Sequence, residues 1–360
     1  MELKKPLVVH LCGSTSSEYY EGVSLYYACS CVAVQEKRSR YEHFVLRCHI
    51  DGTWSLPESF SEQDLANAPR LPMWEALRDV TLRNPDVMVP HMFCYEGMTN
   101  LRGMLSQICP FVGCPVGAMA LSTDKWKSRA VVESFGVPVP RGQLLRQGDR
   151  PTIPTPFILK PCREDNSMGL SLYRGTSEED LDKVLARAFE FDTEIVCEQF
   201  ISLGRELRVG VLETDQGLQM LPCMEYFLTE DHPIRESADK YVTDSSGVPT
   251  TLTSGRRQCP ASIDTQLAER LKTLAFLSHT ALGCKHYSLF DVRIDPDGKP
   301  YFLEACLYCS FAPKSVLVSM TCAAGQHEAE MFESLVDCTI KSKAQNKLSG
   351  GSGHHGMRKK

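Results

Sequence analysis

The sequence lacks any uninterrupted apolar run of about 20 residues, the length that a helix needs to cross a bilayer. Its first residues, MELKKPLVVHLCG, contain an apolar stretch that is too short for a signal peptide. It also lacks an excess of positive charge: 45 acidic residues outnumber 39 lysines and arginines, which gives a net charge of -6. This balance argues against a broadly basic surface for nucleic acid. We therefore expect a soluble cytoplasmic protein with no nucleic-acid or membrane partner.

Cysteine is plentiful, but it lacks the spacing of a disulfide framework or a metal site. The 16 cysteines are spread along the chain without a regular interval, so we expect reduced and mostly buried thiols. The only C-x-x-C, Cys306 to Cys309, has no second pair at zinc-finger spacing, and coincidence explains it better than zinc does. The tail, with His354 and His355 in GSGHHGMRKK, is typical of a flexible end.

The first 115 residues alternate short apolar runs with helical patterns, which predicts a parallel α/β layer. The dinucleotide pattern G-x-G-x-x-G is missing there, so dinucleotide binding is not predicted. The whole length of 360 residues allows two or three domains. The expected strands of the first layer are 6–12, 45–50, 87–89 and 111–113, and a helix is expected over 22–34.

Two lysines occupy positions where they could meet an anion. A helix is predicted to run from a cap at Ser122 or Thr123 to Phe135, and Lys125 lies in its first turn, where a cation opposes the helix dipole. The run PFILKP predicts a buried strand that ends with Lys160. On its own, each lysine is more simply explained as a solvated surface charge.

A polar loop closed by glycine, residues 162–169, follows this strand and leads to a second strand, LSLYR. Such a loop can fold over phosphates with its backbone N–H groups. Ser177-x-x-Asp180 predicts the start of a helix that covers the sheet. Residues 228–256 show no period and predict a long loop of the kind that often forms a lid. Further strands are expected at 195–201 and 206–212, and a further helix at 263–283.

The most informative stretch is YSLFDVRIDPDGKPYFLEACL, residues 287–307, which predicts a β-hairpin whose register can be calculated. The dipeptide Asp297-Gly298 favours a two-residue type I′ turn. With that turn, the face toward the core pairs Phe290 with Ala305, Val292 with Leu303, and Ile294 with Tyr301.

The other face of the hairpin places two carboxylates directly across from each other. Asp291 faces Glu304 with roughly 5 Å between the Cβ atoms, so the two charges repel unless a cation lies between them. All-oxygen ligation by carboxylates suits Mg²⁺ that is held jointly with phosphates. From the hairpin alone, two solvated carboxylates on an exposed face are an equally good explanation.

In chain order, these features resemble the ATP-grasp enzymes, and within them the D-alanine–D-alanine ligase branch. The shared features are a strand-end lysine, a glycine-closed loop, a hinge glutamate, a Lys-Tyr pair in a lid and an acidic hairpin, over residues 6 to about 335. The resemblance implies an ATP- and Mg²⁺-dependent ligase that forms C–N bonds, commonly as a homodimer. It implies an α/β fold with an N-terminal parallel α/β domain (1–115), a small central α+β lid domain (116–203), a C-terminal antiparallel-sheet domain (204–345) and a tail (346–360).

The resemblance also implies roles for individual residues. Lys240 and Ser167 would act in catalysis, and Asp291 and Glu304 would hold the metal ion. ATP would be bound by Lys125, Lys160, Asn166, Ser167, Gly169, Glu198, Phe200, Ile201, Glu206 and Lys240.

Two segments, 139–153 and 286–315, look most like the ligases that complete mycosporine-like amino acids, which join an amino acid to mycosporine-glycine. Two departures from the D-alanine ligases bear on this narrower reading. Leu289 stands where those enzymes have an oxyanion arginine, and Cys306 stands where an asparagine helps to hold a second metal ion. The implied substrate-binding residues are Ser315 and Lys314 for the acceptor carboxylate and, by a loose match, Glu21 for the amine of the first substrate.

Two alternatives to a mycosporine-glycine ligase stay open at this point. One is a true D-alanine–D-alanine ligase. The other is a weakly catalytic ATP-binding regulatory module, which the neutral side chains of Leu289 and Cys306 would favour. A structural protein with these motifs by accident is improbable, because their order and spacing agree with the resemblance throughout.

Overall fold

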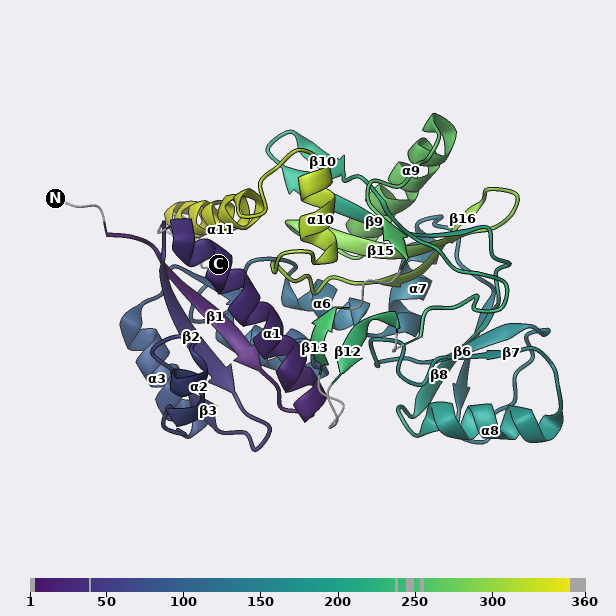
Figure 1. The fold of residues 1–360 in the computed structure, drawn as a ribbon, viewed down its shortest axis with the longest axis horizontal. Helices are drawn as coiled ribbons and strands as arrows, with labels where there is room; N and C mark the ends of the chain where they lie inside the picture. Colours follow the sequence, from purple (N-terminus) through teal and green to yellow (C-terminus); the bar gives the residue numbers. More distant parts are fainter. Residues whose placement is uncertain (1–3, 39, 237–238, 244–248, 253–255, 350–360) are drawn as a thin grey trace, which may run out of the picture.

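The computed structural model describes residues 4–38, 40–236, 239–243, 249–252 and 256–349. This part of the chain forms four sheets with helices packed around them (Figure 1). None of its helices is long and apolar enough to cross a membrane. The tail prediction beyond Ser349 lies outside the described residues, as do positions 237–238, 244–248 and 253–255 of the predicted lid.

The N-terminal sheet has the strand order β3-β2-β1-β4 and is the predicted parallel layer except for its edge strand β3, which is antiparallel to β2. Strand β1 runs parallel to both β2 and β4. Its apolar residues after Leu7 are buried because α1 packs on one face of the sheet and α3 on the other. The predicted strand at 111–113 is reduced to a single parallel bridge between Met88 and Phe111. The elements of this layer are β1 (Leu7–Gly13), α1 (Glu18–Gln35), a 3₁₀ turn η1 (Glu36–Arg38), β2 (Glu42–Cys48), β3 (Trp54–Ser55), α2 (Glu62–Asn67), α3 (Met73–Arg83), β4 (Val87–Pro90), α4 (Tyr95–Met98), α5 (Asn100–Leu105) and α6 (Val116–Ser122).

A chain of three histidines crosses this sheet. His10 on β1 lies between the other two: its Nδ1 is 3.0 Å from His91 Nε2, and its Nε2 is 2.9 Å from His43 Nδ1. Burial disfavours the charged form of each ring, and it lowers the pKa of His43 to about 4 and that of His91 to about 3. The pKa of His10 is lowered by burial and then by its two neighbours. All three rings are therefore neutral in the folded protein at pH 7.

We expect the free energy of unfolding to fall as the pH drops from about 6.5 toward 4. In this window the unfolded chain takes up protons at these histidines while the folded protein does not, which costs up to about 1.4 kcal/mol per pH unit for each residue. Urea unfolding between pH 7 and pH 5 measures the slope, and His43→Gln should reduce it. An unchanged slope in this variant would show that His43 is protonated in the folded state.

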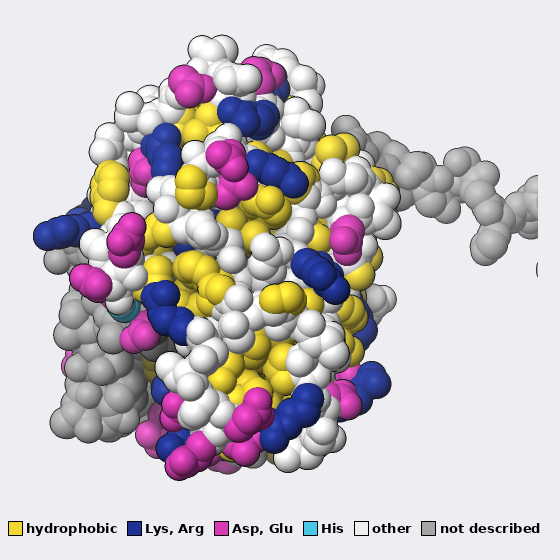
Figure 2. All heavy atoms as spheres, turned by 90° about the vertical axis from the view of Figure 1, so that its right-hand side faces the viewer, with side chains coloured by type: hydrophobic (Ala, Val, Ile, Leu, Met, Phe, Trp, Pro, Cys, Tyr) yellow, Lys and Arg dark blue, Asp and Glu magenta, His cyan; other side chains and the backbone are white. Residues whose placement is uncertain are grey.

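The central sheet, in the order β5-β8-β6-β7, is covered on one side by α8. The helix begins at Ser177, whose side chain accepts a hydrogen bond from the backbone N–H of Asp180, as predicted. The cap of α7 differs from the prediction, because Asp124 caps it in place of Ser122 or Thr123. Figure 2 shows the side of the molecule that lies at the right in Figure 1, and acidic and basic side chains are interspersed on it. The elements are α7 (Lys125–Ser134), β5 (Gly142–Arg146), β6 (Phe157–Pro161), β7 (Ser171–Tyr173), α8 (Glu178–Phe189) and β8 (Glu194–Gln199).

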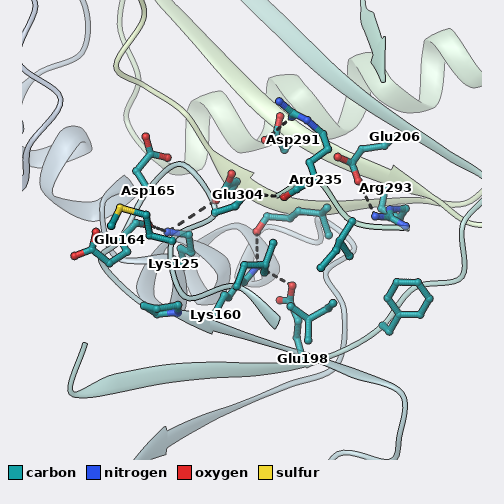
Figure 3. A pocket seen from close by; sticks show the side chains of 18 of the residues that line it. Lys125, Lys160, Glu164, Asp165, Glu198, Glu206, Arg235, Asp291, Arg293 and Glu304 are labelled. Carbon is teal, nitrogen blue, oxygen red and sulfur yellow. Dashed lines mark hydrogen bonds and ion pairs between the residues drawn. The ribbon is translucent and has the colours of Figure 1, made fainter. Parts of the chain in front are cut away.

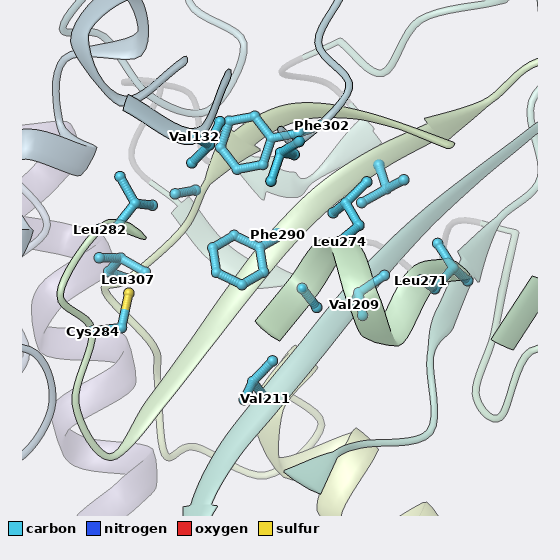
Figure 4. Packing of buried hydrophobic residues seen from close by; sticks show 14 of the residues in the cluster. Val132, Val209, Val211, Leu271, Leu274, Leu282, Cys284, Phe290, Phe302 and Leu307 are labelled. Atoms are coloured by element: carbon cyan, nitrogen blue, oxygen red, sulfur yellow. The ribbon is translucent and has the colours of Figure 1, made fainter. Parts of the chain in front are cut away.

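The C-terminal sheet is antiparallel throughout, in the order β14-β11-β9-β15-β16 with β10 beside β9. Its inner face packs Phe290, Phe302 and Val209 against α9 and α7, which fixes the position of both central strands (Figure 4). Part of the predicted lid forms the ribbon β12-β13. The elements are β9 (Arg205–Thr214), β10 (Gly217–Met220), β11 (Met224–Tyr226), β12 (Tyr241–Thr243), β13 (Pro249–Leu252), β14 (Arg257–Gln258), α9 (Thr265–Ala281), β15 (Tyr287–Ile294), β16 (Pro300–Ala305), α10 (Val316–Ala323) and α11 (Glu330–Ser349).

The hairpin of β15 and β16 confirms half of the calculated register and corrects the rest. Phe290 pairs with Ala305, and Asp291 pairs with Glu304, as predicted. A bulge follows Asp291, so Val292 pairs with Phe302, and Ile294 pairs with Pro300.

The cause of this shift lies in the turn. Gly298 has a φ of 81°, whereas Asp297 does not have a positive φ, and the hydrogen bonds join Asp295 to Gly298 and Lys299. The turn is therefore a three-residue loop that ends in a left-handed glycine, and the predicted type I′ turn is wrong. One extra residue on β16 is taken up by the bulge, which places Phe302 in the core and points Leu303 away from it.

Candidate functional site

Two adjoining cavities lie where the central and C-terminal sheets face each other. The first, of about 100 Å³, is enclosed by β6, β8, the loop after β6 and the hairpin strands β15 and β16 (Figure 3). The second, of about 320 Å³, lies between β9, the segment around residue 235, α1 and α10. Asp165, Arg235 and Lys240 line both cavities. A ligand in one cavity therefore lies next to a ligand in the other.

Three predicted lysines converge on the first cavity. Lys160, at the end of β6, donates to Glu198 at 2.7 Å and to the carbonyl of Leu303 at 3.1 Å. That carbonyl belongs to the bulged residue, so the bulge supplies the contact. Lys125 opens α7, contacts the backbone carbonyl of Glu164, and lies 3.9 Å from Glu304. Burial removes water from the ammonium group of Lys240, which lowers its pKa.

The inner end of the first cavity has the character of a nucleotide-base slot. Phe200 and Ile201 supply apolar walls, and Glu198 presents one carboxylate oxygen, Oε2, that is buried without a hydrogen-bond partner in the structure. A buried acceptor of this kind needs a donor, such as the amino group of a purine. Glu206 lines the same cavity and accepts a hydrogen bond from Arg293 at 2.7 Å. These residues fit ATP.

The loop after β6 is sharply folded over the cavities. Asn166 and Ser167 both have positive φ, at 54° and 63°, and Gly169 has a φ of 69°. Ser167 lines the first cavity, where its hydroxyl donates to the carbonyl of Arg235 at 2.7 Å, and Asn166 lines the second. Gly169 lines neither cavity, and a Cβ there would lie 2.7 Å from the side chain of Pro161. Gly169 therefore shapes the loop through close packing.

Asp291 and Glu304 lie opposite each other, and their oxygens lie within 4.8 Å of each other and of the Cys306 sulfur. Burial raises the pKa of Asp291, but Arg208, Arg235 and Lys240 together outweigh burial, so the pKa lies well below its usual value. The pKa of Glu304 is raised by burial, lowered by Lys125 and raised again by Asp291. Two mutually repelling carboxylates fit a divalent cation, whereas the thiol of Cys306 does not suit Mg²⁺.

The predicted substrate residues are placed differently from one another. Ser315 lines the second cavity, is 4% exposed and donates to the carbonyl of Ser310 at 2.8 Å. Lys314 lines neither cavity, and its carbonyl accepts from Arg257. Glu21 also lines neither: its carboxylate accepts from Arg47 at 2.9 Å within the N-terminal domain. The loose match at Glu21 therefore gains no geometric support, because a nearer cation occupies the carboxylate.

Several cations of the site were missed by the sequence reading. Arg208 and Arg235 line the second cavity beside Asp291, and Arg235 lies over the ring of Tyr226 at 3.6 Å from its centroid. A signal existed for Arg208: Glu-Leu-Arg on β9 and Asp-Val-Arg on β15 are complementary when the two strands run antiparallel. No periodicity marks Arg235, which lies in an irregular segment.

A matching family model and a relative of more than 30% identity, together with the fold, define the chain as an ATP-grasp ligase. The family model described as "D-ala D-ala ligase C-terminus" matches residues 132–337, and the chain belongs to this family. A D-alanine–D-alanine ligase from Bordetella petrii is 31% identical over 259 residues, which cover 70% of this chain and 74% of that protein. A Sinorhizobium fredii protein called y4sG, described as uncharacterized, is 27% identical over 70% of this chain and 73% of its own length.

Solved structures show the same fold. The VanG D-Ala:D-Ser ligase from Enterococcus faecalis superimposes with a TM-score of 0.71 at 22% identity, over 93% of this chain and 99% of that one. The D-alanine–D-alanine ligase from Coxiella burnetii gives a TM-score of 0.72 at 19% identity, over 96% and 97%. These likenesses confirm the predicted α/β ATP-grasp class.

Proposed function

We propose that the protein joins the amine of a free amino acid to mycosporine-glycine at the expense of ATP. The γ-phosphoryl group of ATP passes to the ketone oxygen of mycosporine-glycine, which is part of a vinylogous amide. The amine then bonds to the ring carbon, the bond from that carbon to the phosphate oxygen breaks, and a proton leaves to solvent. The products are an imine-linked mycosporine-like amino acid, ADP and phosphate.

In this proposal the chain's own residues position and neutralise the reacting groups. Lys125, Lys160 and Lys240 surround the triphosphate, and phosphoryl transfer consists mainly of such positioning and charge neutralisation. Ser167 holds the loop to the segment around Arg235, which keeps water from the reacting groups. Asp291 and Glu304 would hold Mg²⁺, which supplies charge neutralisation between phosphate oxygens when it is bound. A homodimer remains a prediction.

One observation carries the proposed substrate: the second cavity combines aromatic rings with an excess of cations. Tyr27, Phe93 and Tyr308 contribute rings, and arginines and a lysine outnumber the acidic side chains among the residues that line it. A planar unsaturated ring that bears a carboxylate matches both features. The neutral Leu289 and Cys306 in the same wall also suit a conjugated ring carbon better than a carboxylate-derived intermediate.

Mass spectrometry of the products after incubation with ATP, Mg²⁺, mycosporine-glycine and a mixture of amino acids tests this proposal. We expect a product whose mass equals mycosporine-glycine plus one amino acid minus water, formed together with ADP. Omitting mycosporine-glycine is the control, and it should abolish ADP release. Absence of the condensed product would refute the proposed substrate.

A second candidate, D-alanine–D-alanine ligase, is favoured by the similarity to the Bordetella petrii enzyme. It predicts phosphate release from ATP with D-alanine as the sole other substrate. ATP binding without turnover on any amine and acid would instead favour the weakly catalytic regulatory module.

A further inference from the structure

One face of strands β9 and β15 carries a ladder of charge pairs that ends at the second cavity. Glu206 lies opposite Arg293, Arg208 opposite Asp291, and Gly210 opposite Leu289. The acid is on β9 in the first pair and on β15 in the second. The ladder therefore runs from the nucleotide-base slot, past the carboxylate pair, to an uncharged step.

Arg208 stands at the boundary between the two cavities. Its Nε and Nη2 donate to the two carboxylate oxygens of Asp291, and both side chains are largely buried, at 13% and 10% exposure. Asp291 lines the first cavity, whereas Arg208 lines the second. A guanidinium has five N–H donors, and this pair uses one edge of it. Among the described residues, Asp291 is its only hydrogen-bond acceptor.

The second cavity carries an excess of positive charge around Arg208: its described lining includes four arginines and a lysine against two carboxylates, Asp165 and Asp239. Leu289 and Cys306 are neutral, and Arg235 adds a second positive charge near Asp291, at 4.0 Å from its Oδ2. The carboxylate of Asp291 thus lies beside two guanidinium groups. An anion in the second cavity would restore the balance, and the open edge of a guanidinium is shaped for a carboxylate.

We propose that Arg208 binds both sites at once: one edge of its guanidinium holds Asp291, and the other binds the carboxylate of the substrate in the second cavity. This rests on the proposed function only in the identity of that substrate. Arg208 thereby couples the cation site to the substrate site with opposite effects. It attracts the anionic substrate, and its positive charge weakens the binding of a divalent cation at Asp291 and Glu304.

Two titrations of the full chain test this coupling. Mn²⁺, used as the probe for the cation site, is titrated by electron paramagnetic resonance without nucleotide. Mycosporine-glycine and D-alanine are titrated by calorimetry in the presence of ADP and Mg²⁺. In Arg208→Gln we expect the substrate carboxylate to bind about 10- to 100-fold more weakly, while Mn²⁺ binds about tenfold more tightly. Arg208→Lys, which keeps the charge but loses the fork, should weaken the substrate and leave Mn²⁺ nearly unchanged.

Arg205→Gln is the matched control. Arg205 lies on the same strand and makes a similar two-pronged pair with Glu225, but it lines neither cavity. It should alter neither titration. A purely structural role for Arg208 predicts that both ligands weaken together in Arg208→Gln, and that result would overturn the proposal, as would wild-type protein that binds neither probe.

Failure of the proposed function gives a different pattern. If the wild type binds D-alanine but not mycosporine-glycine, and the opposite shifts persist with D-alanine, the proposed substrate is wrong and the role of Arg208 stands. If mycosporine-glycine is converted normally and Arg208→Gln binds it as well as the wild type, the function stands and the role of Arg208 is wrong.

Discussion

The variant Glu304→Gln should lose ADP formation by about 10²- to 10³-fold while remaining at least as stable as the wild type. Loss of one of the two carboxylates removes half of the protein charge that would hold the divalent cation, and electrostatic groups of this kind are worth about 10²- to 10³-fold each. Steady-state release of ADP measures the first effect. Urea unfolding without nucleotide or metal measures the second.

The stability half of this prediction follows from the surroundings of Glu304. Its side chain is 23% exposed and faces Asp291 across the strand pair, and its one ion pair among the described residues is with Lys125 at 3.9 Å. Because burial and Asp291 both raise its pKa, the ionised carboxylate is disfavoured in the folded protein. A neutral amide of the same shape removes that repulsion.

Asp291→Asn is the contrasting variant. It should lose activity to a similar degree, but it should also be destabilised by about 3–5 kcal/mol, because Arg208 would be left as a buried charge without its partner. If Glu304→Gln were destabilised as much as Asp291→Asn, the two carboxylates would be equivalent structural groups. A variant that kept full turnover would show that its carboxylate does not belong to a cation site.

The acidic pair could be predicted from the sequence because local rules determine it. A hairpin has few possible registers, and its alternation of apolar residues leaves Asp291 and Glu304 on the face away from the core. Local rules also fixed the cap of α8 at Ser177. The bulge at Leu303 was missed because it depends on which turn forms, and the one-residue change in the turn shifts every pair between the turn and the bulge.

The partners of the site residues were less accessible to sequence reasoning. Arg208 and Asp291 are 83 positions apart in the chain, and their contact arises only when β9 is known to lie beside β15. The carboxylate of Glu21, on α1, accepts a hydrogen bond from Arg47 on β2. Motif order therefore predicted the fold and the acidic and basic centres, whereas tertiary pairing decides which charges remain available to a ligand.

Replacement of the strand-end lysine, Lys160→Met, should reduce ADP formation by at least about 10²-fold and weaken the binding of nucleotide. The ammonium group lies in the first cavity at the end of β6, where it would neutralise phosphate charge. Methionine keeps much of the length and apolar stem of lysine but has no charge. Calorimetry with ADP and a coupled assay for ADP release measure the two effects.

The same replacement should also destabilise the protein, because Glu198 loses its only ion-pair partner within the described part of the chain. Glu198 is 5% exposed, one of its oxygens bonds Lys160 at 2.7 Å, and the other already has no partner. A buried carboxylate left alone costs about 3 kcal/mol or more. The double variant Lys160→Met/Glu198→Gln should regain much of the stability but none of the turnover. Recovery of turnover together with stability would show that Lys160 acts only by pairing with Glu198, so that phosphate binding must come from Lys125 and Lys240.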